Sequence, residues 1–255
     1  MNFTVLRFDT LESTNTEAAH QARQGSDEGL CIVAREQTAG RGRHGRTWAS
    51  APGKGLYFSL LLRPTIEAKN LSLITLMAGV AVYDTLKAMH LSPDIKWVND
   101  VLVNEKKICG ILAETVETNR GLAVVLGIGI NIGAGALPDE IAMTSTSIER
   151  ETPLAGPRAI DPLDVETKLT GFLNYWYETL KGPGGGTEII EAWRQRSSYF
   201  SGKPVRVSLH GGVVEGITDG LEQNGALRVR MNDGSVTIVQ AGDVERLRSG
   251  ENSTP

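Results

Sequence analysis

Residues 70–89 are largely apolar around the whole circumference of a helix, rather than along one stripe. A surface helix keeps a polar face, so this segment predicts a buried helix. Short apolar runs that are typical of strands precede it at Phe3–Phe8, Leu30–Ala34 and Gly55–Leu62. A chain that combines a buried helix with such strands is expected to form a mixed α/β domain.

Three further strand candidates follow the buried helix: residues 97–103, 107–116 and 122–132. The turns between them read NEKK and ETNRG, which suit an antiparallel meander. Upstream, LESTNTEAAHQARQG predicts a helix, in which Thr14 and Glu17 have capping-box spacing and Gly25 can end the helix.

Two more helices are expected at residues 163–180 and 187–199, after a Pro-rich loop over 137–162 and on either side of GPGGG. From Gly202 the chain changes to KPVRVSL, VVEGITDGL, GALRVRM and SVTIVQ, separated by Gly, Asn and Asp turns. Such spacing predicts a small antiparallel barrel of ~45 residues. We therefore expect a mixed α/β domain over residues 1–200, a barrel over 201–248 and a disordered tail over 249–255.

Composition narrows the class of protein. The 255 residues carry a formal net charge of -4, which argues against duplex DNA as the main partner. The first residues, MNFTVLRFDT, lack the pattern of a signal peptide, and the apolar stretches are judged shorter than the ~20 residues that cross a bilayer. Cys31 and Cys109 lie in apolar runs without metal-ligand spacing and predict reduced core thiols. A cytoplasmic protein without membrane contact is expected.

The segment TAGRGRHGRTW, residues 38–48, concentrates Arg41, Arg43 and Arg46 on a glycine-rich loop between two expected strands. A solvated surface loop, an RNA-binding segment and a site for a phosphorylated small ligand all need weighing. RNA-binding Arg–Gly segments usually occur as repeats, whereas this chain has one copy. Glycines allow backbone N–H groups to approach an anion, and guanidinium groups bind phosphate or carboxylate in a fork. A phosphorylated small ligand is the best physical match.

Two other stretches carry polar residues at strand ends. KWVND contributes Asn99 and Asp100, with Lys107 soon after, and GIGINIG contributes Asn131. Each is weak alone, because Asn and Asp in turns usually cap the backbone and glycines in strands usually mark bulges.

Taken in order, these motifs strongly resemble the biotin–protein ligase family. The matching segments are STN at 13–15, QTAGRGRHGRTW at 37–48, KWVND at 96–100, KKICGIL at 106–112 and GIGINI at 127–132. GITDGLEQNGALRV, at 216–229, is similar to the family's C-terminal domain, so the resemblance covers nearly the whole chain. Val98 departs from the proline that the family usually has there. Some members also carry an N-terminal winged helix; here the first strand begins at Phe3, so we expect none and no sequence-specific DNA binding.

The resemblance implies a class II aminoacyl-tRNA synthetase-like mixed sheet with helices, followed by an SH3-like β-barrel. It implies that biotin and ATP form biotinyl-5′-AMP with release of pyrophosphate, and that a lysine of a biotin carboxyl carrier protein then accepts the biotin. Mg²⁺ is expected to bridge the ATP phosphates, and the resemblance does not identify which protein residues bind the ion. A homodimer is a possible assembly. The alternatives are a lipoate–protein ligase-like acyl-adenylate transferase and a biotin-responsive regulator.

The resemblance also implies roles for individual residues. Arg43 and Lys107 are the expected catalytic residues, and His44 is expected to be solvated. Ser13 and Thr14 also fit plain helix capping, which is compatible with ligand binding. The expected biotin-binding residues are Ser13, Thr14, Asn15, Gln37, Gly40, Arg41, Gly42, Arg43, Lys107 and Gly110. The expected ATP-binding residues are Arg41, Arg43, Arg46, Trp48, Asn99, Asp100, Lys107 and Asn131.

Overall fold

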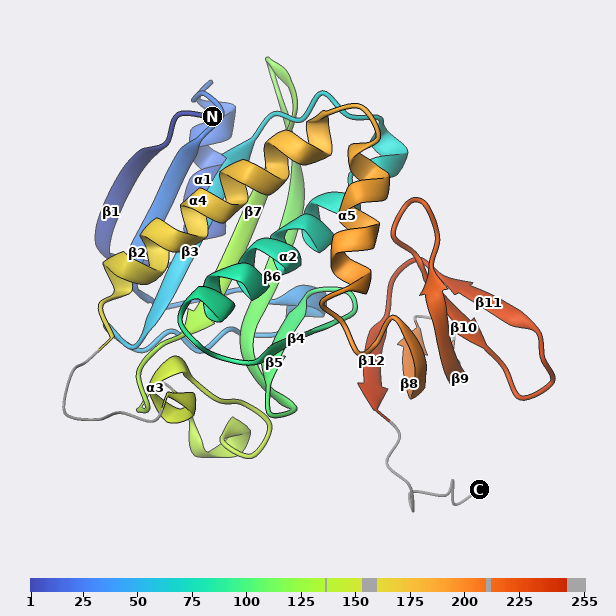
Figure 1. The fold of residues 1–255 in the computed structure, drawn as a ribbon. Helices are drawn as coiled ribbons and strands as arrows, with labels where there is room; N and C mark the ends of the chain where they lie inside the picture. The colour runs from blue at the N-terminus through green and yellow to red at the C-terminus, as the bar shows by residue number, and fades with distance from the viewer. Residues whose placement is uncertain (136, 153–159, 210–211, 247–255) are drawn as a thin grey trace.

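A seven-stranded mixed sheet lies at the centre of the larger part of the molecule, in the order β1-β2-β3-β7-β6-β5-β4 (Figure 1). The structure is a computed structural model and describes residues 1–135, 137–152, 160–209 and 212–246. β1 and β2 are parallel, and every other neighbouring pair in this sheet is antiparallel. The predicted meander is confirmed as β5-β6-β7. The strands are β1 (Thr4–Leu11), β2 (Leu30–Gln37), β3 (Gly55–Leu62), β4 (Pro93–Lys96), β5 (Asp100–Val103), β6 (Lys106–Thr118) and β7 (Gly121–Asn131).

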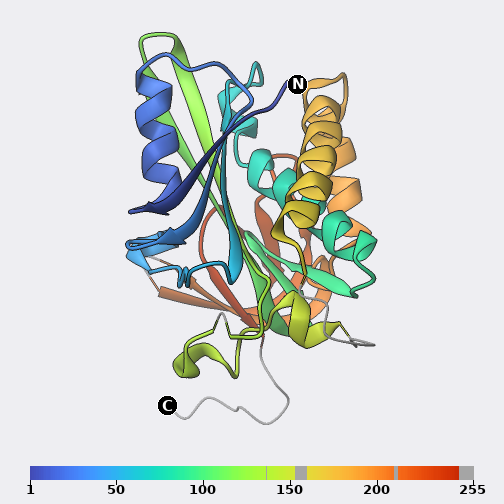
Figure 2. The same cartoon turned by 90° about the vertical axis from the view of Figure 1, so that its left-hand side faces the viewer.

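Helices cover both faces of this sheet. Figure 2 shows α1 (Thr14–Arg23) on one side of the sheet, and α2 (Leu73–Ala88) and α4 (Pro162–Lys181) on the other. The helix α5 (Gly185–Arg194) packs against α2 and α4, and the short α3 (Ile148–Glu151) lies beyond the end of β7.

The predicted buried helix is α2. Eleven of its 16 residues are buried, against the sheet on one side and α4 and α5 on the other. The expectation that no apolar stretch is long enough to cross a bilayer was wrong: the 21 residues Ala68–Ala88 pass by length and composition. However, 61% of the apolar window is buried inside the protein, and the core helix of a globular domain passes the same test.

Three local predictions need correction. Residues 97–103 are not one strand, because Trp97–Asn99 form the turn between β4 and β5, where Lys96 pairs with Asp100. The Trp97–Val98 peptide in this turn is cis. The last helix ends at Arg194 rather than at residue 199, since the hydroxyl of Ser197 instead donates to the Ile95 carbonyl at 2.5 Å.

The third correction concerns the start of α1. Ser13, not Thr14, is the N-cap residue, and it makes no side-chain cap hydrogen bond. Thr14 instead directs its hydroxyl toward Gln37 and Ser59, and the Glu17 carboxylate accepts a hydrogen bond from Gln21. The prediction that Gly25 follows the helix end is confirmed: it has φ +91°, and its N–H donates to the Ala22 carbonyl.

A five-stranded antiparallel sheet forms the C-terminal part, in the order β11-β10-β9-β8-β12 (Figure 1). Its apolar residues join the same hydrophobic cluster as the large sheet. The Trp97 indole N–H donates to the Gly225 carbonyl at 2.9 Å across this junction. The predicted mixed fold class is confirmed, while the expected tail at 249–255 lies outside the described residues. The strands are β8 (Ser201–Leu209), β9 (Gly212–Leu221), β10 (Leu227–Arg230), β11 (Val236–Val239) and β12 (Asp243–Arg246).

Candidate active site

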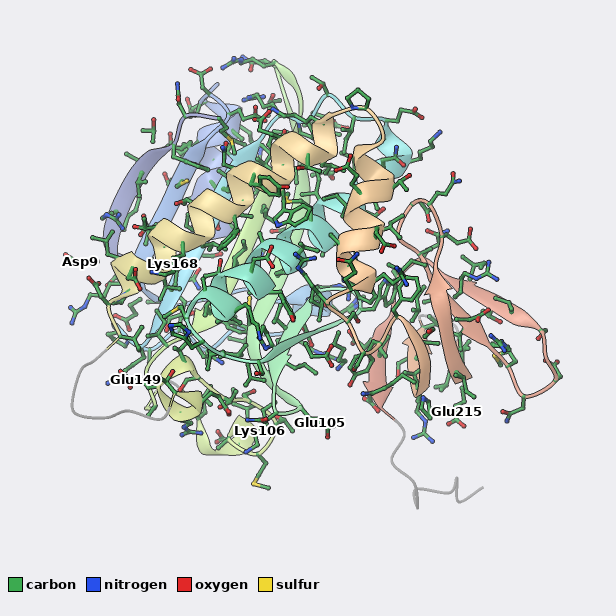
Figure 3. The ribbon with its side chains drawn as sticks, viewed as in Figure 1. Asp9, Glu105, Lys106, Glu149, Lys168 and Glu215 are labelled. Carbon is green, nitrogen blue, oxygen red and sulfur yellow. The ribbon has the colours of Figure 1, made fainter. Side chains whose placement is uncertain are left out.

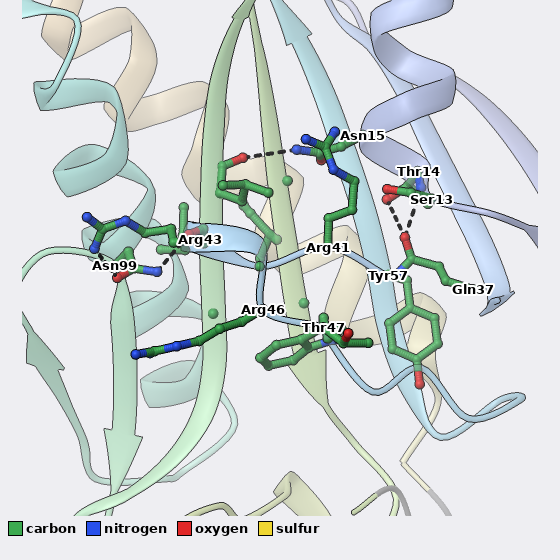
Figure 4. Close-up of a pocket in the computed structure, with 18 of the residues that line it drawn as sticks. Ser13, Thr14, Asn15, Gln37, Arg41, Arg43, Arg46, Thr47, Tyr57 and Asn99 are labelled. Atoms are coloured by element: carbon green, nitrogen blue, oxygen red, sulfur yellow. Dashed lines mark hydrogen bonds between the residues drawn. The ribbon is translucent and has the colours of Figure 1, made fainter. Parts of the chain in front are cut away.

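A cleft with a cavity volume of about 130 Å³ opens between the start of α1, the Arg–Gly loop and the surface of β6 and β7 (Figure 4). β3 supplies part of one wall through Tyr57 and Phe58, and the C-terminal sheet reaches the cleft through Asp243. Polar and charged groups from six separate regions of the chain therefore meet in one cavity. Such convergence in a concave site is typical of ligand binding.

Glycines on β6 and β7 allow side chains to lie directly on the sheet. Gly110 and Gly129 are register partners, and a Cβ on either would come within 2.8 Å of the Trp48 ring. Gly127 lies two residues before Gly129 on the same face of the strand. A Cβ on Gly127 would lie 2.1 Å from Asn15 Oδ1. The glycine pattern therefore reflects close approach of side chains to the sheet rather than a bulge.

The loop between β2 and β3 is a small hairpin rather than an extended segment. The Trp48 N–H donates to the Gly40 carbonyl at 2.9 Å, and the Gly42 N–H donates to the Arg46 carbonyl at 2.7 Å. Arg41 and Thr47 form an isolated bridge between these two bonds. The hairpin directs Arg41 to one side of the cleft and Arg43 to the other (Figure 4).

Every arginine of the loop has an acceptor within the protein. Arg41 Nη2 donates to Glu114 Oε1 at 2.6 Å. Arg43 Nη1 lies 3.2 Å from both Asn99 Oδ1 and the Gly242 carbonyl oxygen. Arg46 Nη2 donates to Asp243 Oδ2 at 2.6 Å, and the same carboxylate lies 3.9 Å from Arg43. The loop is thus attached both to β6 and to the C-terminal sheet.

Lys107 lies at the base of the cleft, where Nζ forms an ion pair with Asp100 Oδ1 at 2.7 Å and lies 5.5 Å from the Trp48 ring centroid. Burial lowers the pKa of Arg43, although the Asp243 and Asp100 carboxylates oppose that shift. An arginine remains charged at neutral pH even so. The cleft therefore presents a cluster of cations, Lys107, Arg43 and Arg46, around its cavity.

The opposite end of the cleft is polar, and the charged pair of Arg41 with Glu114 lies beside Asn15. The Thr14 N–H donates to Gln37 Oε1 at 2.8 Å, and Gln37 Nε2 donates to Ser50 at 2.8 Å (Figure 4). The Ser59 hydroxyl donates to Asn15 Oδ1 at 2.6 Å. This end offers fixed amide and hydroxyl groups, whereas the Lys107 end offers charge.

Most of the residues expected from the sequence lie together here. Gly40 and Asn131 do not line the cleft: a Cβ on Gly40 would lie 2.4 Å from the Trp48 carbonyl oxygen, and Asn131 Nδ2 donates to the Thr146 carbonyl at 3.0 Å. His44 is exposed on the loop, as predicted. The expected residues that do line the cleft are Ser13, Thr14, Asn15, Gln37, Arg41, Gly42, Arg43, Arg46, Trp48, Asn99, Asp100, Lys107 and Gly110. Those that the sequence did not single out are Thr47, Tyr57, Phe58, Ile111, Leu112, Gly127, Ile128, Gly129 and Asp243.

Both cysteines are buried free thiols, as the sequence predicted. Burial raises the pKa of Cys31 to about 12, and burial also raises that of Cys109. Neither thiol lines the cleft. Among the residues that the structure describes, no group of three or more His, Cys, Asp or Glu side chains could hold a metal ion.

Comparison with known proteins identifies the family. Residues 7–131 match the biotin/lipoate A/B protein ligase family, and residues 200–247 match the biotin protein ligase C-terminal domain. The chain is 34% identical to a biotin–(acetyl-CoA-carboxylase) ligase of Paracoccus denitrificans, over 90% of this chain and 95% of that protein. The chain belongs to the biotin–protein ligase family. The enzyme class predicted from the sequence motifs is therefore confirmed.

Two further relatives support this assignment. The ligase is 35% identical to the bifunctional ligase/repressor BirA of Bacillus subtilis, over 93% of this chain and 72% of that protein. Among solved structures, the biotin protein ligase of Aquifex aeolicus in complex with biotin and ATP superimposes with a TM-score of 0.82 at 27% identity, covering 96% of this chain and 99% of that one. These relatives confirm the predicted activity, the ATP-dependent biotinylation of a carrier protein.

Proposed function

We propose that this cleft joins biotin to the α-phosphate of ATP and then transfers biotin from the mixed anhydride to a lysine of a biotin carboxyl carrier protein. The observation that carries the proposal is the polarity of the cleft: fixed hydrogen-bonding groups at the α1 end and cations at the Lys107 end. The ureido ring of biotin needs the first kind of surface, and the carboxylate and phosphates need the second. Residues 1–200 then form the catalytic domain, and residues 201–248 a C-terminal domain that completes its wall.

The biotin ring occupies the α1 end in this proposal. Ser13, Thr14 and Gln37 supply hydrogen-bonding groups, and Tyr57, Phe58 and Ile128 supply apolar surface for a ring system. The carboxylate at the end of the valeryl tail then faces Lys107. A cation at this point stabilises the carboxylate as it approaches a polyanion.

ATP occupies the other end of the cleft. Arg43, Arg46 and Lys107 are the cations that face its phosphates, and charge developing on the phosphoryl oxygens is stabilised by groups already in place. Trp48 offers its indole face as one wall. Asn131 is the residue proposed to contact adenine, although its Nδ2 already donates a hydrogen bond to the Thr146 carbonyl oxygen.

Mg²⁺ fits the donor groups present. Asp100 and Asp243 are the carboxylates that line the cleft, and Mg²⁺ is usually bound by one or two carboxylates together with substrate phosphates. These two residues would hold the ion, which supplies charge neutralisation at the phosphate oxygens. In the structure Asp100 is paired with Lys107 and Asp243 with Arg46.

A direct test uses the purified chain with biotin, ATP and a biotin carboxyl carrier domain. We expect biotin-dependent release of pyrophosphate, and mass spectrometry should find biotin on one carrier lysine. Lipoate offered in place of biotin should not be incorporated. Pyrophosphate release that depends on lipoate and not on biotin would overturn the proposal in favour of the lipoate branch.

Lys107→Ala is expected to lower the rate of pyrophosphate release by about 10²–10³-fold, because it removes a preorganised cation from the reacting groups. The matched control is Lys106→Ala, which removes the same charge from the neighbouring residue on the outer part of the β5-β6 hairpin (Figure 3). The control should retain the wild-type rate. An equal loss in both variants would argue for a general electrostatic effect and remove Lys107 from its assigned role.

A further inference from the structure

Glu114, on β6, connects the Arg–Gly loop to the start of α1. Its Oε1 accepts a hydrogen bond from Arg41 of the loop at 2.6 Å, and its Oε2 accepts one from Asn15 of α1 at 2.9 Å. Each oxygen therefore serves a different donor. Glu114 does not itself line the cleft, whereas both of its partners do.

The Asn15 side chain is held in one orientation. Nδ2 donates to Glu114 and to the Leu112 carbonyl oxygen, at 3.2 Å, while Oδ1 accepts from Ser59. The residue is buried, and Gly127 leaves the space in which its amide lies. A buried amide in which both ends are hydrogen-bonded cannot turn over without losing bonds on both sides.

The same network continues to the other end of the loop. Ser59 Oγ lies 2.8 Å from Thr14 Oγ1, and Thr14 contacts Gln37 Oε1. Gln37 Nε2 donates to Ser50, whose hydroxyl donates to the Trp48 carbonyl at 3.2 Å. The polar end of the cleft is thus bonded to the loop on both sides, and Glu114 makes the connection to Arg41.

We propose that Glu114 is a positioning residue that couples occupancy of the polar end of the cleft to the position of the Arg41 side of the loop. This inference rests on the proposed function, because the ligand of that end is biotin. A biotin ring that contacts Asn15 and Thr14 favours the network in its present arrangement. Glu114 carries that preference to Arg41, which keeps the loop over the ligand.

The discriminating variant is Glu114→Gln. Glutamine has nearly the same shape but only one acceptor oxygen, so it can serve Arg41 or Asn15 but not both, and its NH₂ group then faces a donor. Glu117→Gln is the matched control, since it is the same change at an exposed position on the same strand. Arg41→Gln, alone and combined with Glu114→Gln, shows whether Glu114 acts through Arg41.

Three measurements are needed: biotin affinity by calorimetry without ATP, the ATP KM for pyrophosphate release, and trypsin cleavage within residues 41–46 with and without saturating biotin. In the wild type and in Glu117→Gln, biotin should slow this cleavage. In Glu114→Gln, we expect biotin to bind about tenfold more weakly, the loss expected for one charge-assisted hydrogen bond. Saturating biotin should no longer slow cleavage, and the ATP KM should change by less than about twofold.

Adding Glu114→Gln to Arg41→Gln should weaken biotin binding no further. Wild-type affinity and protection in Glu114→Gln would overturn the inference, as would equal changes in the biotin and ATP parameters. If Glu114→Gln does not fold, Glu114→Asp, which keeps the charge on a shorter side chain, provides the same comparison of protection with and without biotin. Failure of the wild type to bind biotin would instead overturn the proposed function, so the two failures can be distinguished.

Discussion

The arginines of the loop differ in how strongly the protein already holds them. The Arg43 side chain is 20% exposed and contacts acceptors on two different elements, whereas that of Arg46 is 69% exposed and contacts one carboxylate. An exposed ion pair contributes roughly 0.2–1 kcal/mol, and a hydrogen bond to a less exposed charge contributes roughly 1.5–3 kcal/mol. Arg43 is therefore the residue on which the position of the loop depends most.

Arg43→Gly is expected to slow adenylate synthesis by about 10²–10³-fold and also to release biotinyl-5′-AMP into solution faster. The second effect follows because a glycine removes both the proposed phosphate contact and the hydrogen bonds to Asn99 and Gly242 that attach the loop. The measurement is single-turnover synthesis from radiolabelled ATP, followed by separation of free from bound adenylate.

His44→Asn is the control, because His44 is exposed and has φ 54°, a backbone conformation that asparagine accepts. It should behave as the wild type. Slower synthesis by Arg43→Gly without faster escape would leave the loop as a fixed phosphate site rather than a lid.

For single residues, the sequence predicted which side chains lie in the cleft better than it predicted the groups that they contact. Arg41, Arg43 and Lys107 could be assigned to the cleft because their motifs resemble a family. Glu114 and Asp243 could not, since a carboxylate in an alternating strand looks like any solvated residue. Their contacts with the loop join positions 73 and 197 residues apart, and only the folded chain defines them.

Two strands, β6 and β7, form the base of the cleft, and their glycines decide how close the loop can approach. Gly129→Ala would put a Cβ 2.4 Å from the Trp48 ring, so that Trp48 must move. Overpacking of this kind costs roughly 1–3 kcal/mol, and we expect adenylate synthesis to fall by at least about fivefold. Steady-state pyrophosphate release and thermal unfolding measure the two effects separately.

Gly171→Ala is the matched control for this prediction. Gly171 lies within α4, and a Cβ there meets nothing within 4 Å. The added methyl group should raise the free energy of unfolding by about 0.5–1 kcal/mol, because alanine favours a helix over glycine. Its activity should be unchanged, and a similar loss of activity in both variants would contradict the packing argument.

Elements with strong periodicity were predictable, and elements set by distant contacts were not. β3 is Gly55–Leu62, as the apolar run predicted, and α2 lies within the predicted buried helix. The break between β4 and β5 was missed, because WVNDVLV has the composition of a strand and its turn depends on Trp97 contacting Gly225, 128 residues away. The glycines of β7 looked like possible bulges because nothing local shows what lies on them.

At the scale of the whole molecule, the C-terminal sheet is part of the cleft and not only an appended unit. Its composition predicted short antiparallel strands, but nothing in the sequence indicated that β12 would contact the Arg–Gly loop. Gly242 precedes that strand and Asp243 begins it, and both residues contact arginines of the loop. The position of the Arg–Gly loop therefore depends on contacts between residues that are about 200 positions apart in the chain.

Asp243→Asn tests this dependence directly. The substitution removes the carboxylate that Arg46 and Arg43 contact, so the ligand-free loop should open more often and trypsin should cleave within residues 41–46 about two- to fivefold faster. Biotin and ATP without Mg²⁺ should reduce the difference, because the ATP phosphates proposed to contact Arg43 and Arg46 would also help to hold the loop. Asp27→Asn is the control. It breaks a 2.8 Å surface ion pair with Arg120, which involves no residue of the loop, and it should not change cleavage within residues 41–46. Unaltered cleavage in Asp243→Asn would mean that the other contacts of the loop, those of Arg43 with Asn99 and Gly242 and that of Arg41 with Glu114, are sufficient to hold it.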